Sequence, residues 1–250
     1  MDERIKTAIA DHALAEYPRE CCGLVVRVET GDEYVRCRNV AVTPAEHFAL
    51  APEDYAAAED RGEVVALAHS HPGASARPSA ADRAMCERSG IASWVIVSLG
   101  IQADGSIGVD DWSEFGPQGY VAPLVGREFV HGIHDCYAIV RDWYLAERGI
   151  VLPDFERPDD WWNDGRSSLY LDHYVEAGFV DVGRDAELQV GDVMLMQIRS
   201  GNDVPNHAGV YIDDGKFLHH MHGRLSARAV WGGMWADHCV TVLRYVGGSA

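Results

Sequence analysis

The sequence has no run of apolar residues approaching roughly 18, the length expected of a membrane-spanning helix. Its first segment, MDERIKTAIADHALAEY, carries charges throughout and lacks the apolar centre of a signal peptide. These two absences predict a protein that does not insert into a membrane. They also predict that it is made in a cytoplasm and leaves that compartment only if something else carries it out.

Positive charge is scarce, because 21 Lys and Arg face 39 Asp and Glu, for a formal net charge of -18 at pH 7. An acidic chain repels polyanions, so nucleic acid is not an expected partner. No Cys-x-x-Cys pair occurs, which argues against a zinc ribbon, and two of the six cysteines, Cys21 and Cys22, are adjacent. A chain of 250 residues does not need disulfides for stability, so we expect free thiols.

The chain does contain ample apolar sequence, 47% of its residues, arranged in two successive patterns. In the first half, helical and strand-like segments alternate and predict a mixed sheet with helices against it. The expected helices span 3–17, 51–62 and 79–89, and the expected strands span 22–28, 33–40, 63–71 and 93–100.

The second half follows a stretch rich in Gly and Pro at about 113–123, which we expect to be a linker. One early helix is followed by several antiparallel strands, an order typical of an α+β fold. The helices are expected at 135–148 and 167–177, and the strands at 191–198, 207–212, 216–221 and 239–246. We therefore predict two domains, residues 1–115 and 116–250.

The stretch AHSHPGASARPSAAD at 68–82 contains a candidate metal site. His69 and His71 end a predicted strand, and residues two apart on a strand face the same side. Asp82 lies three residues after Ser79, the predicted N-cap of a helix. Two imidazoles, one carboxylate and an open position are typical of catalytic zinc. Either part alone is often only a surface loop or a helix cap, but their combination favours the metal site.

A metal-activated water needs a proton acceptor, and Glu20 is the candidate. It directly precedes a predicted buried strand, where a carboxylate is costly without a partner. The Ser79 hydroxyl is placed to hydrogen-bond a developing oxyanion.

Glu20, HSHP and the following Ser-x-x-Asp resemble the JAMM/MPN metalloprotease signature, and ECCG resembles the E-x-C-G of its prokaryotic members. The resemblance covers residues 1–112. It implies Zn²⁺ held by His69, His71 and Asp82, with Glu20 as general acid/base, Ser79 supporting the intermediate, and cleavage of peptide or isopeptide bonds.

A second constellation centres on Cys136, which opens the helix predicted in HDCYAIVRDWY. A helix N-terminus stabilises an anion and so favours a thiolate. His207 begins a strand and His219 follows twelve residues later, so a hairpin turning at 213–215 places them side by side. His207 is the candidate base and His219 the residue that orients it. Strand alternation sends His220, a competing third member, to the face opposite His219.

The competing interpretation is a buried structural cysteine beside ordinary core histidines. Asp135 is expected to cap the helix rather than to act in catalysis, and Tyr120 is a less favoured lining residue. The segment DDWWNDG at 159–165 either contacts a sugar or peptide or only covers the core, and the second interpretation is favoured.

HDC, VGDVML and NHAGVYI resemble the NlpC-type cysteine peptidases, which cut peptide stems of the bacterial cell wall on a papain-like fold. This resemblance covers residues 118–250. One departure is that Tyr137 and Ala138 stand where many members have Ser-Gly, which affects the expected shape of the pocket.

A JAMM-like half followed by an NlpC-like half is similar to the tail-tip assembly protein K family of long-tailed phages, and GREFVHGIHDCYAIVRDWY and LHHMHGRLS strengthen this resemblance. The resemblance implies a protein in the host cytoplasm that assembles with other phage tail-tip proteins. It also implies a peptidoglycan peptide as substrate. The protein at the virion tail tip would cut this peptide in the periplasm or cell wall. Two alternatives stay open: a structural component with vestigial sites, and a metal half that processes a tail protein.

Overall fold

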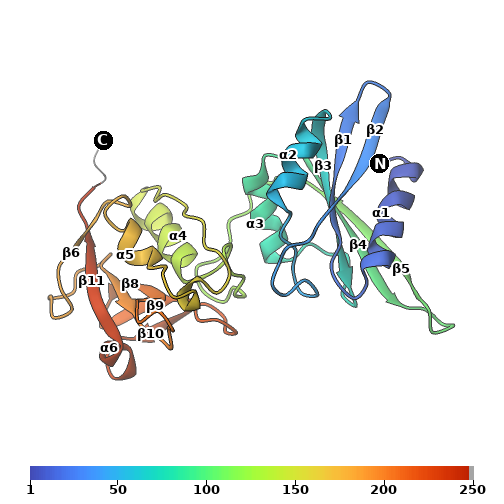
Figure 1. The fold of residues 1–250 in the computed structure, drawn as a ribbon. Helices are drawn as coiled ribbons and strands as arrows, with labels where there is room; N and C mark the ends of the chain where they lie inside the picture. Colours follow the sequence, from blue (N-terminus) through green and yellow to red (C-terminus); the bar gives the residue numbers. More distant parts are fainter. Residues whose placement is uncertain (248–250) are drawn as a thin grey trace. The chain divides into compact units, whose positions relative to one another are not determined.

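The computed structural model describes residues 1–247, which form two compact units, Met1–Val121 and a second that begins at Ala122 (Figure 1). Each unit has its own hydrophobic core and combines helices with a sheet, so the α+β organisation in two domains is confirmed. No helix within residues 1–247 has the length and apolar character needed to cross a bilayer.

The first unit is a five-stranded sheet with helices on both faces (Figure 1). Its strands lie in the order β2 (Gly31–Cys37), β1 (Cys22–Val28), β3 (Glu63–Pro72), β4 (Ser93–Ile101) and β5 (Ile107–Phe115). β3 and β4 are parallel, and the other neighbours are antiparallel. The helices are α1 (Glu3–Glu16), α2 (Pro52–Glu59) and α3 (Ala80–Ser89).

Helix α1 covers one face of this sheet. The Asp2 side chain caps it by accepting the backbone N–H groups of Arg4 and Ile5. Ile5, Ile9 and Ala13 recur at four-residue spacing and are buried against the sheet, as expected for an amphipathic helix. The opposite face packs against α2 and α3 through a second cluster that includes Leu24, Phe48 and Trp94.

Strand β5 was not expected from the sequence. It lies at the edge of the sheet and contains Gly108, Asp110 and Asp111, residue types that are depleted in strands. Its pairing with β4 also shifts register near Ser98, which disturbs the alternation of its side chains. The strand therefore extends into the segment that was expected to be the linker.

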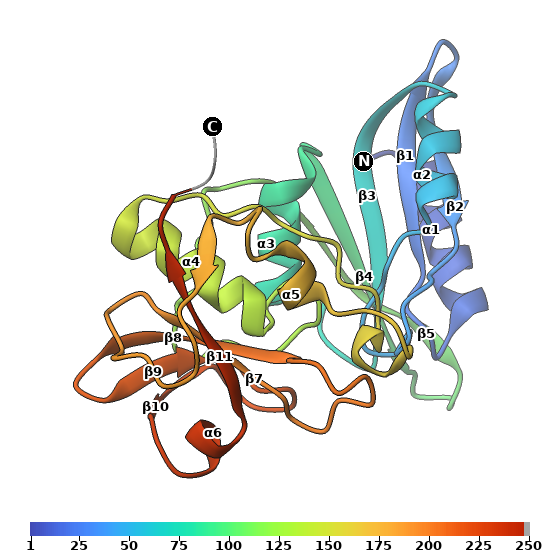
Figure 2. The ribbon, with the colours of Figure 1, turned by 60° about the vertical axis from the view of Figure 1, so that its left-hand side comes forward.

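The second unit is a six-stranded antiparallel sheet. Its order is β10 (Ala227–Val230), β9 (Lys216–His219), β8 (His207–Asp213), β7 (Val193–Met196), β11 (Cys239–Tyr245) and β6 (Phe179–Asp181). Helices α4 (Cys136–Arg148) and α5 (Leu169–His173) lie on one face (Figure 2). Two short elements complete the unit, η1 (Trp161–Asn163) and α6 (Met234–Asp237).

The shortest elements of this unit were not predicted from the sequence. β6 and β10 are edge strands of three and four residues that depend on pairing with β11 and β9. Of the helix expected at 167–177, only Leu169–His173 is helical in the structure. Segments this short carry too little periodic pattern to be recognised without their partners.

Helix α4 places the thiol. The Asp135 side chain caps it as predicted, accepting the N–H groups of Tyr137 at 3.0 Å and Ala138 at 2.8 Å. Ile139 and Trp143 are buried on its inner side, and Gly149 ends it with a positive φ. Cys136 therefore stands in the first turn of a well-anchored helix.

Candidate functional site

The three predicted metal ligands converge at the end of β3. His69 Nε2 lies 3.2 Å from His71 Nε2 and 3.2 Å from Asp82 Oδ1. His71 Nε2 lies 3.4 Å from Asp82 Oδ2. Strand alternation puts both imidazoles on one side, and α3 returns the carboxylate to them.

The helix cap holds that carboxylate in place. Ser79 Oγ accepts the backbone N–H of Asp82 at 3.0 Å, and Asp82 Oδ2 accepts the backbone N–H of Ser79 at 2.7 Å. This reciprocal pair is a capping box. The cap interpretation and the ligand interpretation are therefore compatible, since the cap orients the carboxylate toward the histidines.

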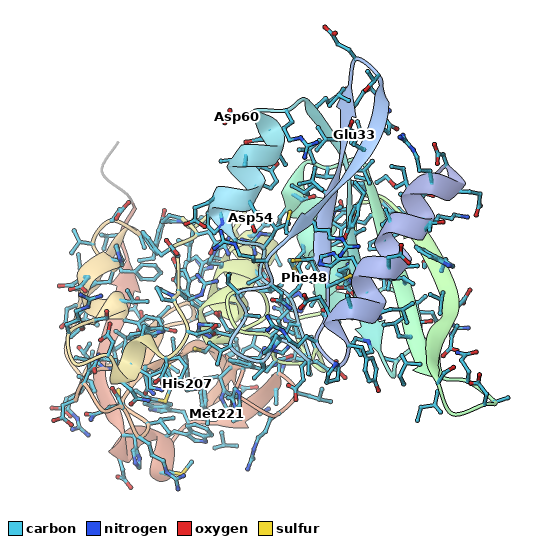
Figure 3. The ribbon with its side chains drawn as sticks, turned by 45° about the vertical axis from the view of Figure 1, so that its right-hand side comes forward. Glu33, Phe48, Asp54, Asp60, His207 and Met221 are labelled. Atoms are coloured by element: carbon cyan, nitrogen blue, oxygen red, sulfur yellow. The ribbon has the colours of Figure 1, made fainter. Side chains whose placement is uncertain are left out.

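The surroundings orient both imidazoles. The ring of His69 is fully buried against Phe48, with ring centroids 4.6 Å apart. Phe48 is labelled in Figure 3. His71 Nδ1 is 2.7 Å from the carbonyl oxygen of Ser75, so it carries the proton of the neutral ring. The lone pair of His71 Nε2 consequently points to the centre of the cluster.

These residues fit a zinc ion. Ligand atoms about 2.0–2.1 Å from tetrahedral zinc lie about 3.3 Å from one another, close to the separations of the three side chains. One ligand atom from each residue lies within 4.8 Å of the others. The unprotonated Nε2 of His71 faces a carboxylate oxygen, and two acceptors at this separation require a cation or a shared proton.

The charge states of these three side chains also fit a bound cation. Burial alone would raise the pKa of Asp82, but hydrogen bonds with His69 and His71 outweigh it and hold the pKa far below its usual range. Burial lowers the pKa of His69. Burial opposes charge on His71 as well, but Asp82 and the Ser75 carbonyl raise its pKa.

Glu20 lies at the same end of the sheet, because β1 runs antiparallel to β3. Cys22 pairs with His69, and the backbone N–H of Cys21 donates to Ser70 Oγ at 2.8 Å. Glu20 is buried, and burial raises its pKa to about 8, although nearby His71 opposes the shift. A buried carboxyl with a pKa close to neutrality, beside a candidate cation site, suits a group that both accepts and donates a proton.

Cys136 occupies a second site. All six cysteines are free, and Cys136 is the one that is only half-buried. Its Sγ lies 3.2 Å from Tyr170 Oη and 3.9 Å from the carbonyl oxygen of Asn206. Burial, with a contribution from the Asp135 carboxylate, raises the pKa of the Cys136 thiol to about 11. Burial therefore opposes the thiolate that the start of α4 favours.

The two histidines of the hairpin meet as expected. His207 Nε2 is hydrogen-bonded to His219 Nδ1 at 3.1 Å. Burial and His219 lower the pKa of His207 to about 3, and burial lowers that of His219 to about 4, so both rings are neutral at pH 7. His219 stacks on Phe217, with ring centroids 4.6 Å apart.

His220 points away from His219, as alternation predicts, and packs edge-on against Phe129. His220 nevertheless lines the same cavity as Cys136 and His207, which strand alternation alone did not indicate. Both of its ring nitrogens are buried without a hydrogen-bond partner in residues 1–247.

Cys136 and His207 line one cavity of about 320 Å³. Aromatic rings form a large part of the rest of its wall, including Phe129, Tyr137, Phe155, Trp161, Trp162 and Tyr170. The tryptophans of DDWWNDG therefore contribute to this site in addition to covering the core.

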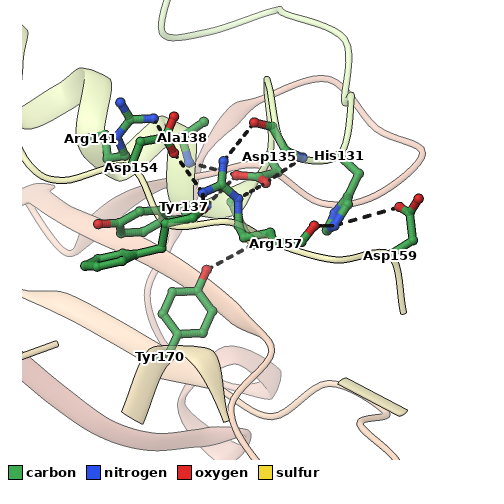
Figure 4. Close-up of polar contacts among 12 residues, drawn as sticks. His131, Asp135, Tyr137, Ala138, Arg141, Asp154, Arg157, Asp159 and Tyr170 are labelled. Carbon is green, nitrogen blue, oxygen red and sulfur yellow. Dashed lines mark hydrogen bonds and ion pairs between the residues drawn. The ribbon is translucent and has the colours of Figure 1, made fainter. Parts of the chain in front are cut away.

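Arg157 anchors the start of α4 within this wall (Figure 4). It donates to Asp135 Oδ2 at 2.6 Å and to Asp154 Oδ1 at 2.9 Å. Burial alone would raise the pKa of Asp135, but the Arg157 charge outweighs it and lowers the pKa. Asp135 is thus a fixed anion that caps the helix, as predicted.

Tyr170 was not predicted as a site residue, and the sequence contained no strong indication of any tyrosine near the thiol. Tyr120, the less favoured candidate, belongs to the first unit, where its N–H donates to Glu87 at 2.8 Å. Tyr170 lies 34 residues from Cys136 in sequence, so no local spacing could have identified it.

Comparisons with known proteins agree with this architecture. The family described as prokaryotic homologs of the JAB domain matches residues 2–112, and the NlpC/P60 family matches residues 126–244. Tail tip assembly protein K of Escherichia phage N15 is 40% identical over 246 residues, which cover 98% of this chain and 96% of that protein. Tail tip assembly protein K of Escherichia phage lambda is 40% identical over 196 residues, which cover 78% and 89%.

Among solved structures, an NLP/P60 family protein of Staphylococcus aureus subsp. aureus Mu50, described as similar to lipoprotein, is 18% identical with a TM-score of 0.36. The match covers 50% of this chain and 38% of that one.

Proposed function

Because the chain belongs to the tail tip assembly protein K family, we propose that this tail protein is also a peptidase whose second unit hydrolyses peptidoglycan stem peptides. Cys136 is the nucleophile, His207 the base and His219 the residue that orients the base. The observation that carries the proposal is that the one half-buried thiol and His207, which is hydrogen-bonded to His219, line a single cavity.

The proposed reaction starts from a neutral thiol and a neutral imidazole. The sulfur attacks the carbonyl carbon of the scissile bond while its proton passes to His207 Nδ1, the ring nitrogen that His219 does not engage. His207 then gives this proton to the leaving amine, and a thioester joins the acyl group to Cys136. Water, deprotonated by His207, hydrolyses the thioester and returns the thiol.

Tyr170 assists as a positioning residue. Its hydroxyl contacts the sulfur at 3.2 Å and fixes the direction of the thiol. When the sulfur gains negative charge, the phenolic O–H becomes the donor of a charge-assisted hydrogen bond.

For the first unit we propose a zinc-dependent peptidase or isopeptidase. His69, His71 and Asp82 would hold Zn²⁺, which supplies Lewis acidity and lowers the pKa of water. Glu20 would carry the proton between water and the leaving amine, and Ser79 has a hydroxyl hydrogen free to support the intermediate, since its oxygen is the acceptor in the cap.

The partners follow from the family. We propose that the protein acts with other phage tail-tip proteins, first in the host cytoplasm during assembly and then at the tail tip against peptidoglycan. The alternatives are a structural component with vestigial sites, and a metal unit that processes a tail protein. Comparing tail-protein sizes in lysates that carry intact or H69A protein tests the last alternative.

The deciding experiment is a digest of purified peptidoglycan analysed by mass spectrometry. Wild type should release stem-peptide fragments, C136A should release none, and C239A, which removes a buried cysteine outside the cavity, should match wild type. Equal release by wild type and C136A would remove the thiol mechanism.

A further inference from the structure

The cavity at Cys136 carries an unbalanced positive charge in an otherwise acidic chain. Its charged lining residues are Asp135, Arg157 and Arg199. Asp135 and Arg157 form an ion pair at 2.6 Å, with side chains only 2% and 8% exposed, so they neutralise each other. Arg199 is left, and its guanidinium has no ion pair or hydrogen bond within residues 1–247.

The backbone holds Arg199 in an unusual conformation. Its φ is +53°, in the left-handed region that a residue other than Gly adopts only under constraint. The constraint comes from both neighbours. Ile198 N–H donates to Asn206 Oδ1 at 2.7 Å while Asn206 Nδ2 donates to Ile198 O at 2.9 Å, and Ser200 Oγ donates to Trp162 O at 3.1 Å.

The same contacts tie Arg199 to the nucleophile. Asn206, which clamps Ile198, directly precedes His207 and places its own carbonyl oxygen 3.9 Å from Cys136 Sγ. The loop of Arg199 is therefore fixed relative to the sulfur and its base. With the backbone held, only the exposed side chain of Arg199 has to be ordered when it binds a ligand, which limits the entropy cost.

The wall around this cation is mostly apolar, and the carbonyl of Trp162 accepts a hydrogen bond from Ser200, the next residue of the loop. A guanidinium next to apolar surface forms stronger hydrogen bonds with an anion than one in bulk water, and its planar fork matches a carboxylate.

We propose that Arg199 binds a carboxylate of the substrate, so that the cavity selects peptides with a free carboxylate beside apolar groups over the same peptides with that carboxylate amidated. This specificity rests on the proposed peptidase function of Cys136. Arg199 discriminates between substrates and takes no part in bond breaking.

Alkylation of Cys136 tests the proposal without any peptide. Iodoacetate and iodoacetamide both form an S–CH₂ bond as the thiol proton and iodide leave, but only iodoacetate carries a carboxylate. R199Q should lower the iodoacetate rate about three- to tenfold and leave the iodoacetamide rate unchanged. R199K should retain part of the difference, and R228Q, an exposed arginine of β10 outside the cavity, should behave as wild type.

Mass spectrometry of peptide fragments separates Cys136 from the five buried cysteines. The same ratio of the two rates in wild type and R199Q would overturn the proposal.

Synthetic stem peptides supply the second arm. For a peptide with a free carboxylate, R199Q should raise KM about tenfold with little change in kcat, and for its amidated counterpart R199Q should match wild type. An equal KM increase for both peptides would refute the assignment. Cleavage of neither peptide by wild type would refute the proposed function, and the alkylation ratio would then decide the role of Arg199 alone.

Discussion

His207 Nε2 and His219 Nδ1 lie 3.1 Å apart, with their rings nearly perpendicular at 82°. The two residues are on neighbouring strands, β8 and β9, so the hairpin sets this contact. One nitrogen of His207 is therefore engaged by His219, which leaves Nδ1 as the atom that can take a proton. The packing of His219 against Phe217 and Trp235 keeps the arrangement rigid.

Removing this contact should slow peptide hydrolysis. We expect H219A to lower kcat about tenfold to a hundredfold, because His207 loses the partner that fixes its tautomer. H219N should recover part of the loss, since its amide can still accept a hydrogen bond. A kcat for H219A equal to that of wild type, in a folded protein, would show that His219 does not orient the base.

The buried histidines should make the second unit sensitive to acid. Burial lowers the pKa of His207 to about 3 and of His134 and His220 to about 4, whereas the unfolded chain titrates near about 6.5. The unfolded state therefore binds more protons below that pH, so stability is complete above it and is lost as pH falls toward 4. Chemical unfolding at pH 7 and pH 4.5 measures this loss, and H207Q should reduce it. A free energy of unfolding that is the same at both pH values would contradict the prediction.

Zinc binding should depend on the charge of Asp82. We expect stoichiometric zinc in wild type at pH 7 and affinity at least about a hundredfold lower in D82N, which can retain the cap but not the anion. S79A is the matched control, because it removes the Ser79 oxygen that caps the helix and keeps the carboxylate. It should bind zinc while lowering the free energy of unfolding by about 1 kcal/mol. Zinc content by mass spectrometry or a chromogenic chelator tests this, and a wild type without zinc would reject the metal site.

The hydroxyl of Tyr170 should affect the thiol itself. In Y170F the developing thiolate loses a donor 3.2 Å away, so the rate of iodoacetamide alkylation at pH 8 should fall about three- to tenfold. The midpoint of the pH–rate profile should also move upward. Y174F is the control, since Tyr174 lines the same cavity without a hydrogen bond to Sγ. Identical pH profiles for Y170F and wild type would exclude this role.

Local patterns in the sequence predicted a large part of both sites. Strand alternation places His69 and His71 on one side, and the Ser79 cap predicts where Asp82 begins its helix. The hairpin spacing brings His207 to His219, and Asp135 caps α4. Each of these depends on residues close together in the chain, where the periods of helix and strand fix the direction of a side chain.

The sequence by itself determined the α+β class, the residues of the candidate metal cluster and the contact between His207 and His219, because short-range geometry encodes them. Tertiary structure alone decided that Tyr170, Trp162 and Asn206 surround Cys136 and that Arg199 faces the same cavity. It also decided how deeply the thiol is buried. Burial depends on which distant segments pack around an atom, and desolvation by those segments opposes the thiolate that the start of α4 favours.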